Sequence, residues 1–289
     1  MEERVAFQSA ELQLAGILHL PNDMKPGERR PAFLVLHGFG SNKASSNCVN
    51  PCRMLASWGY AAMRFDFRGC GESEGEKARV ICLEQVADVR AAVSYLGTRR
   101  DIDGTRVAAV GSSFGAAVAV YAGGVDERLA AIISSGGWGD GETKFRRQHA
   151  SPEAWARFTR MMEEGRRAKA DGRTLMVPRY DIVPIPPHLR TNLASNSIME
   201  FPFDTVESMF EFRANEVVGK IAPRPLLLLH SSNDSVTPTE QSVRLFEHSR
   251  QPTDLHLFAE TDHFMFSDEN PRVVSVIRGW LDKYFPARA

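Results

Sequence analysis

The chain has 289 residues, 43% of them hydrophobic, and its 35 Lys and Arg nearly balance its 36 Asp and Glu, for a formal net charge of −1. A net charge near zero creates no long-range field that would attract polyanions, so we expect neither nucleic acid nor a membrane surface as a partner. The length exceeds one minimal core, and the 17 Phe, 4 Trp and 5 Tyr exclude a chain that is disordered throughout.

The cysteines and the N-terminal segment indicate the compartment. Cys48, Cys52, Cys70 and Cys82 lie in the first third of the chain without a C-x-x-C pair, which predicts free thiols in a reducing environment. Cys48 and Cys52 are four residues apart, but no compact set of further Cys or His follows them, so we expect no metal site. The first residues are acidic and lack the apolar segment of a secretory signal, and the apolar runs are too short to span a bilayer. We therefore expect a cytoplasmic protein.

Short apolar runs alternate with amphipathic helical segments along most of the chain. Residues 5–7 and 12–20 resemble an antiparallel hairpin at a sheet edge. Continuous apolar runs typical of strands covered on both faces follow, at residues 32–36, 60–65, 107–110, 129–133, 225–230 and 255–258. Apolar residues at three- and four-residue steps predict helices at 83–96 and 268–284. This alternation favours an α/β fold with a mostly parallel, eight-stranded sheet and helices on both faces.

The alternation stops between about Trp138 and Asn215. This interval contains a predicted helix at 152–170, a Pro-rich passage at 178–187 and a second helical stretch at 205–213. Because a coil of this length is unusual inside a compact domain, we interpret residues 138–215 as an inserted cap. Residues 1–137 and 216–289 would then form the core.

Charge is unevenly distributed within the predicted cap. Residues 144–190 carry eleven Lys and Arg against five Asp and Glu, whereas residues 200–216 carry five acids and one Arg. The simpler interpretation is two solvated helix faces of opposite sign. The alternative is a cationic lid that favours substrates bearing a carboxylate.

A G-x-S-x-G sequence, Gly111-Ser112-Ser113-Phe114-Gly115, stands between a predicted strand and a helix of small residues. The glycines permit the sharp strand-to-helix turn that raises Ser113 above the strand ends, at a helix N-terminus whose dipole favours negative charge. Ser113 is therefore the candidate nucleophile. Ser112 is the rival within the motif, but its side chain is expected to point away from the site.

A serine hydroxyl needs a base, itself oriented by a carboxylate. His263 lies in a loop between the last strand and the final helix, so it is the candidate base. His230 and His256 fall in or at the end of apolar strands, where a packed core histidine is expected, while His149 and His188 lie in the cap and could touch substrate. The other histidines are His19, His37 and His248.

The candidate orienting acid is Asp234, in the loop that follows the strand at 225–230. This loop lies at the carboxyl end of a parallel strand, the edge where open α/β sheets build their sites. Asp262 is a rival, but neighbouring side chains on an extended loop tend to point apart. Asp66 is a second rival, and an ion pair that ties down its loop is the favoured interpretation for it.

Acyl transfer also needs donors aimed at the oxyanion. His37-Gly38-Phe39-Gly40 follows the strand at 32–36, and its small residues let a backbone N–H face the nucleophile. We expect the amides of Phe39 and Phe114 to form the oxyanion hole. A phosphate-binding loop is disfavoured because the segment lacks G-x-x-x-x-G-K-[ST] and G-x-G-x-x-G.

The chain resembles the α/β-hydrolases, which use the order Ser113, Asp234, His263 for their triad. The segments HGFGSNK, RFDFRGCGES, GSSFGA and NDSVTP are similar to those of cinnamoyl and feruloyl esterases and related bacterial carboxylesterases. This resemblance implies the same roles for the triad, for the amides of Phe39 and Phe114, and for the cap. The chain departs from the group at Cys70, where relatives often have His, and in its longer insert. Dienelactone hydrolases use Cys as nucleophile, which Ser113 argues against.

These observations predict a serine hydrolase that cleaves small to medium acyl or aryl esters through an acyl-enzyme. Thioesterase, lactonase, amide or peptide hydrolase and carbon–carbon hydrolase activities use the same triad, and a non-catalytic ligand-binding protein is a further alternative. We expect no metal or organic cofactor, a small-molecule ester as substrate, and a monomer or homodimer. Candidate pocket walls in the cap are Trp138, Trp155, Phe158, Met161, Met162, Tyr180, His188 and Phe201.

Overall fold

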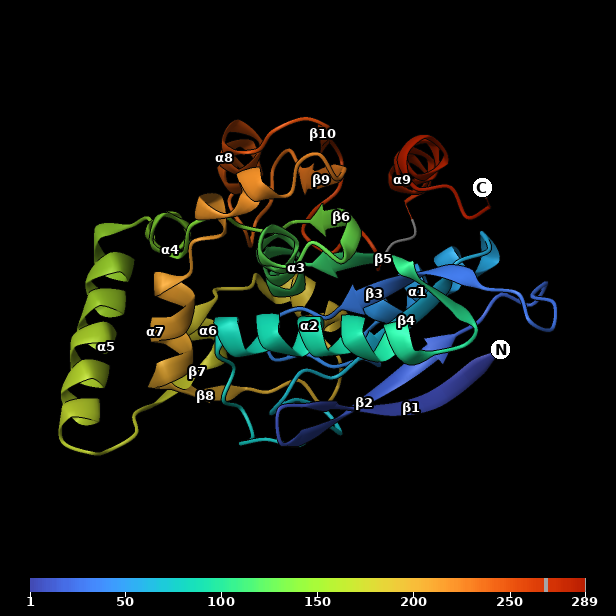
Figure 1. Ribbon diagram of the computed structural model, residues 1–289. Coiled ribbons are helices and arrows are strands. Elements are labelled where there is room, and N and C mark those ends of the chain that lie inside the picture. The colour runs from blue at the N-terminus through green and yellow to red at the C-terminus, as the bar shows by residue number, and fades with distance from the viewer. Residues whose placement is uncertain (268–269, 289) are drawn as a thin grey trace.

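A computed structural model describes residues 1–267 and 270–288 and contains an eight-stranded sheet with the order β1-β2-β4-β3-β5-β6-β9-β10 (Figure 1). The strands of this sheet are β1 (Glu2–Ser9), β2 (Leu12–His19), β3 (Arg30–Leu36), β4 (Ala61–Phe65), β5 (Ile102–Ser112), β6 (Leu129–Ser135), β9 (Leu226–Ser231) and β10 (Thr253–Phe258). β1 pairs with β2, and β2 with β4, in antiparallel register, and all other neighbours are parallel. The predicted edge hairpin and mostly parallel sheet are confirmed.

Helices cover both faces of the sheet because its central strands are apolar on both sides. On β3, Phe33 and Val35 join the apolar cluster that contains α1 and α9, whereas Leu34 and Leu36 join the cluster that contains α2, α3 and α8. These helices are α1 (Ser46–Ser57), α2 (Cys82–Thr98), α3 (Phe114–Val125), α8 (Glu240–His248) and α9 (Pro271–Tyr284). The core therefore consists of two apolar layers separated by the sheet.

Several element ends differ from the sequence predictions. β5 begins at Ile102, five residues before the predicted strand. Its first half is less apolar, so the sequence pattern does not mark it, but Ile102 pairs with Arg30 of β3. The final helix was predicted from Asp268, which lies outside the described residues. α9 begins at Pro271, where the Asn270 side chain accepts a hydrogen bond from the Arg272 amide at 3.0 Å. A proline at the first helical position and an Asn cap are typical of helix starts.

The chain leaves the sheet after β6 and returns at β9, and the predicted cap, residues 138–215, lies within this interval. The elements between β6 and β9 are α4 (Gly141–Gln148), α5 (Pro152–Ala170), β7 (Met176–Pro178), α6 (Arg179–Ile182), η1 (Pro187–Asn192), β8 (Glu200–Pro202), α7 (Phe203–Glu211), η2 (Ala214–Glu216) and η3 (Val218–Lys220). α5 has the predicted bounds, whereas the second predicted helix starts and ends two residues earlier, as α7. The buried side chains Phe145, Phe158 and Met209 belong to the same apolar cluster as α2 and α3. The interval therefore shares its core with the sheet.

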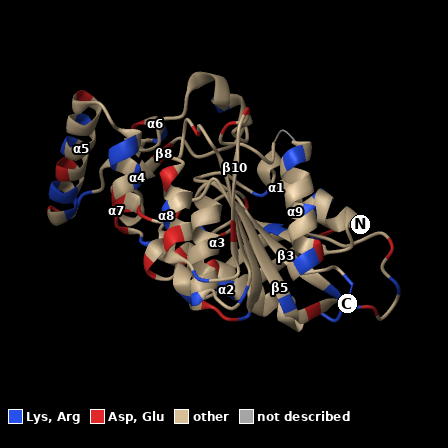
Figure 2. Cartoon of the chain, turned by 90° about the horizontal axis from the view of Figure 1, so that it is seen from above, with Lys and Arg blue, Asp and Glu red and all other residues tan. Residues whose placement is uncertain are grey.

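Some charges of the predicted cap pair with one another between α5 and α7. α5 lies alongside α7, and basic and acidic side chains are interspersed along it (Figure 1, Figure 2). Arg166 Nε lies 3.1 Å from Glu207 Oε1, and Lys169 Nζ lies 2.9 Å from Asp204 Oδ1. Two cations of the basic first part, Arg166 and Lys169, thus pair with acids of the second part.

Two further expectations concern the cysteines and the membrane. Cys48, Cys52, Cys70 and Cys82 are free thiols, as predicted, and all four are buried. Every helix in the described part of the chain is too short or too polar to cross a bilayer.

Candidate active site

Ser113 lies at a sharp turn between β5 and α3. Its backbone has φ 56° and ψ −119°, a conformation that is rare for a residue with a side chain and that marks strained functional turns. The amide of Ser113 donates to Ser135 O at 2.8 Å, which ties the turn to β6. The Ser113 hydroxyl makes no hydrogen bond to another described residue and lines a small cavity. Its rival Ser112 is the last residue of β5 and adopts no such strained conformation.

The two glycines of the motif are required by close backbone contacts. A Cβ at Gly115 would lie 2.5 Å from the carbonyl oxygen of Leu36, and one at Gly111 would lie 2.2 Å from the carbonyl oxygen of Gly115. Neither neighbour can move without displacing a strand or helix, so only glycine fits. These contacts explain why the sharp turn predicted from the sequence requires glycine at both positions.

Asp234 and His263 meet at the carboxyl ends of the two adjacent strands β9 and β10. His263 Nδ1 lies 2.8 Å from Asp234 Oδ2, and both side chains are buried. His263 also lines the cavity that contains Ser113. Because Nδ1 donates to the carboxylate, Nε2 of the ring is left to accept a proton.

A second histidine contacts the same carboxylate. His230 Nε2 lies 3.2 Å from Asp234 Oδ2, and the amides of Val236 and Thr237 donate to Oδ1 at 2.8 and 2.7 Å. Burial alone raises the pKa of Asp234, but the charge of His263 and hydrogen bonds from both histidines outweigh it, so the pKa lies well below its usual value. His230 is the packed core histidine that the sequence predicts, and its contact with Asp234 was not foreseen.

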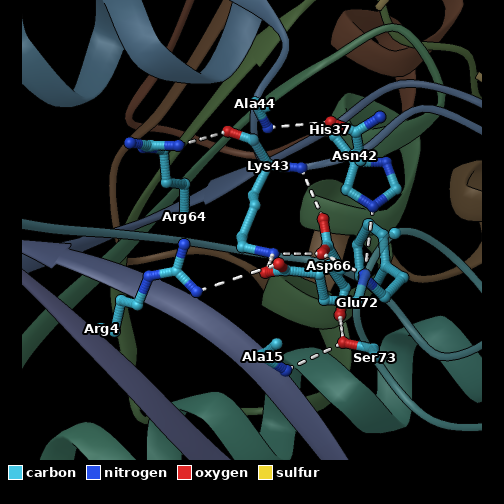
Figure 3. A network of polar contacts seen from close by, with 12 residues as sticks. Arg4, Ala15, His37, Asn42, Lys43, Ala44, Arg64, Asp66, Glu72 and Ser73 are labelled. Atoms are coloured by element: carbon cyan, nitrogen blue, oxygen red, sulfur yellow. Dashed lines mark hydrogen bonds and ion pairs between the residues drawn. The ribbon is translucent and has the colours of Figure 1, made fainter. Parts of the chain in front are cut away.

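The two rival carboxylates make other contacts than the ring of His263. Asp262 accepts hydrogen bonds from the amide and hydroxyl of Ser235, at 2.9 and 2.7 Å. Asp66 is buried and accepts from the amide of Lys43 at 2.6 Å, from the Lys43 ammonium at 2.5 Å and from the amide of Glu72 at 2.8 Å (Figure 3). The predicted ion pair of Asp66 is present, and its partner comes from the loop that follows β3.

This loop also carries the predicted oxyanion donor Phe39. A Cβ at Gly38 would lie 3.7 Å from Cβ of Ser113, so the loop passes directly beside the candidate nucleophile. Among the described residues, the amides of Phe39 and Phe114 donate to no backbone or side-chain acceptor. Burial lowers the pKa of His37, whose neutral ring accepts from the Phe67 amide at 3.2 Å and donates to Gly38 O at 2.9 Å. The structure thus leaves both predicted amides free beside Ser113.

The cavity at Ser113 has a volume of about 30 Å³, room for about one or two water molecules. Its apolar wall comes from cap residues Val183, Ile185 and Leu193 and from Val236 and Phe264. None of these side chains was predicted to line the site. Alternation of apolar residues in the Pro-rich passage was the available signal.

The predicted pocket residues lie elsewhere, which corrects that expectation. Trp138 packs against Phe212, Phe158 packs against Phe145 and His149, and Phe201 stacks on Phe39 with ring centroids 4.2 Å apart. Large apolar side chains gain more from complete burial than from lining a cavity, so they form the packing of the cap. Phe158, Met161 and Tyr180 line a separate hollow of about 390 Å³, Trp155 stacks on Phe158, Met162 is buried and His188 is exposed.

Within residues 1–267 and 270–288, no group of three or more His, Cys, Asp or Glu side chains is arranged to hold a metal ion. Burial raises the pKa of Cys48, Cys70 and Cys82 to about 12, and it raises the pKa of Cys52 well above its usual value. The four thiols are therefore unsuited to act as nucleophiles or ligands in the folded protein.

Comparison with known proteins agrees with this geometry. The sequence model of the family described as serine aminopeptidase, S33, matches residues 27–270. The chain belongs to this family of α/β-hydrolases. The predicted family and fold are therefore confirmed. The comparisons also support the predicted general activity, that of a hydrolase.

Three curated relatives align with most of this α/β-hydrolase. It is 23% identical over 269 residues to an uncharacterized 31.7 kDa protein of Escherichia coli, with 89% of this chain and 92% of the relative covered. It is 26% identical to the acyltransferase drtE of Aspergillus calidoustus, with 88% and 86% covered. It is also 26% identical to the thiohydrolase aneE of Aspergillus aculeatus, with 87% and 83% covered.

Two solved structures share the fold. The α/β-hydrolase GrgF from Penicillium sp. sh18 aligns with a TM-score of 0.79 at 22% identity, covering 98% of this chain and 97% of GrgF. Est1E from Butyrivibrio proteoclasticus, solved with ferulic acid bound, aligns with a TM-score of 0.69 at 18% identity, covering 97% and 98%.

Proposed function

We propose that this α/β-hydrolase cleaves carboxylic esters through an acyl-enzyme on Ser113. The observation that carries the proposal is the shared cavity of the unbonded Ser113 hydroxyl and of His263, whose ring is held by Asp234 at 2.8 Å. His263 Nε2 takes the hydroxyl proton while Ser113 attacks the ester carbonyl, and it then gives that proton to the leaving alkoxide. In the second half-reaction His263 activates a water that releases the acid.

The amides of Phe39 and Phe114 support the same chemistry. Both N–H groups are unpaired among the described residues, and both belong to segments in contact with Ser113. In our proposal they donate to the oxyanion of each tetrahedral intermediate. Phe114 is the first residue of α3, so the helix dipole adds to this stabilisation.

The small cavity limits how a substrate enters. Val183 and Ile185 line it from inside, whereas Pro184 between them lines the outer hollows on the molecule's surface. The segment 183–185 therefore forms part of the wall between this cavity and the outer hollows. We propose that this wall moves outward when an acyl or aryl group binds, and its apolar lining suits such groups.

Thioester hydrolysis is the second candidate, favoured by the likeness to a relative named as a thiohydrolase. It would use the same acyl-enzyme, because ester and thioester substrates differ only in the group that leaves. The two candidates are therefore distinguished by substrate preference.

The test combines active-site labelling with matched substrates. A fluorophosphonate probe should label the wild-type protein on Ser113 and leave Ser113→Ala unlabelled. p-Nitrophenyl esters of rising acyl length, run beside thioesters with the same acyl groups, should be hydrolysed by the wild type and not by Ser113→Ala. Faster turnover of the thioesters at every length would replace the ester proposal by the thioester one. A folded protein that is neither labelled nor active on any substrate would overturn both.

A further inference from the structure

Arg179 is a buried cap residue that contacts the oxyanion loop. It begins α6 and is 2% exposed. Its Nη2 donates to the carbonyl of Phe39 at 2.5 Å, and its Nη1 donates to the carbonyl of Ile198 at 2.8 Å. The guanidinium carbon lies 5.3 Å from the centre of the Phe39 ring. The guanidinium is therefore held in a fixed position by two carbonyls and an aromatic ring.

The third side of this guanidinium has no partner. Nε of Arg179 is buried and makes no hydrogen bond to any described residue. Arg179 also lines the cavity shared by Ser113 and His263. A buried N–H without an acceptor is costly, and an acceptor on a bound ligand would remove that cost.

The charge of Arg179 is also uncompensated. Among the described residues no carboxylate pairs with it, and burial lowers its pKa to about 10. Other cap cations, such as Arg166 and Lys169, pair with acids on α7. Lys144 is likewise buried without a carboxylate partner, but it does not line the cavity at Ser113. An isolated buried cation costs free energy that an anionic ligand would recover.

We infer that Arg179 selects acyl groups that carry a carboxylate, which accepts a hydrogen bond from its Nε when the acyl carbonyl lies at Ser113. This inference rests on the proposed esterase function and names its substrate class: monoesters of dicarboxylic acids. The inference places the carboxylate contact on Nε because its single N–H has no acceptor among the described residues, and the positive charge strengthens that hydrogen bond. Of the eleven basic residues between 144 and 190, the structure thus singles out one for the carboxylate preference.

The test compares esters that differ only in the terminal group. Mono-p-nitrophenyl adipate and p-nitrophenyl hexanoate share a six-carbon acyl chain, and the suberate and octanoate pair extends it by two carbons. The wild type should prefer the carboxylate-bearing member of at least one pair. Arg179→Gln should lower kcat/KM for that ester about 10- to 100-fold more than for its neutral partner, mainly through KM. Arg179→Lys, which retains the charge, should retain part of the preference.

The matched control is Arg166→Gln, an exposed cap cation paired with Glu207, which should leave the preference unchanged. If Arg179→Gln does not fold, the salt dependence of KM in the wild type tests the carboxylate preference. Added salt should raise KM for the adipate ester and leave KM for the hexanoate ester unchanged. Equal losses on both esters would overturn the inference and leave Arg179 a positioning residue for Phe39. A wild type that prefers the neutral ester at both lengths would also overturn it. Neutral-ester turnover and probe labelling of Ser113 report separately on the esterase proposal.

Discussion

His230 Nε2 lies 3.2 Å from Oδ2 of Asp234, the carboxylate oxygen that also contacts His263 Nδ1. His230 is itself held, since Nε2 lies 3.0 Å from Thr237 O and Nδ1 lies 2.6 Å from the Ser242 hydroxyl. A neutral ring that accepts from Ser242 and donates through Nε2 satisfies all three contacts. His230 thus holds the Asp234 carboxylate in place while that carboxylate orients His263.

The first prediction concerns this support. His230→Ala removes a hydrogen bond to the carboxylate that orients His263, so kcat for p-nitrophenyl esters should fall about 10-fold with little change in KM. His256→Ala is the control, because His256 lies on the edge strand β10 and contacts Phe258 rather than the site. Steady-state kinetics of both variants checks the prediction, which fails if the two variants lose activity equally.

The second prediction concerns acid stability. Because the pKa of Asp234 is lowered in the folded protein, its carboxylate stabilises the fold above the ordinary pKa near 3.8, and this contribution disappears as the pH falls toward the folded-state value. Asp234→Asn should therefore have a lower Tm than wild type at pH 7. The difference should shrink as the pH falls below about 4. Thermal unfolding between pH 3 and 7 measures it, and a Tm difference that grows toward acid pH would contradict it.

The third prediction concerns Lys144, whose Nζ is buried without a hydrogen bond and lies 4.0 Å from the centre of the Phe145 ring. Burial lowers its pKa from 10.5 to about 7, an effect that Cys82 partly opposes. Between these values the unfolded chain holds a proton that the folded protein does not, so stability should rise with pH from about 7 to 10.5. Lys144→Met should remove this slope.

Lys144→Met should also raise the free energy of unfolding at pH 7 by about 1–4 kcal/mol, because an apolar side chain replaces an unpaired buried amine. Lys169→Met, at an exposed ion pair, should change it by less than about 1 kcal/mol. Urea unfolding at several pH values measures both. A Lys144→Met protein less stable than wild type throughout this range would indicate that the lysine has an unrecognised partner.

The fourth prediction concerns the polar network around Asp66 (Figure 3). Asp66→Asn leaves the Lys43 ammonium without its buried partner, so the free energy of unfolding should fall by about 3–5 kcal/mol. Lys43 lies in the same loop as Phe39, the proposed oxyanion donor. Loss of its partner should therefore disturb that loop and lower kcat as well. Glu72→Gln breaks the other ion pair of Lys43, where the glutamate is largely exposed, and should cost less than about 1 kcal/mol. Similar losses in both variants would show that Asp66 has no special role.

The elements of the core could be predicted because their signals are local. A run such as residues 32–36 is apolar on both faces wherever it lies, and Gly111 and Gly115 are required by a turn only five residues long. The order of these signals also placed Ser113, Asp234 and His263 after parallel strands. Chain order by itself therefore predicted the fold and the candidate triad.

Which side chains meet across the cap was decided by tertiary structure alone. The sequence shows only that Phe201 is apolar, which suits a pocket wall as well as a packed core. The tertiary structure shows that it stacks on Phe39 and does not line the cavity at Ser113. Arg179 is one of eleven basic residues, and what distinguishes it is its place on the cavity of Ser113, together with a buried Nε that has no described acceptor. Sequence periodicity determines which face of an element is apolar, whereas burial and charge pairing depend on neighbours from distant segments, such as residues 39 and 179, that only the folded chain brings together.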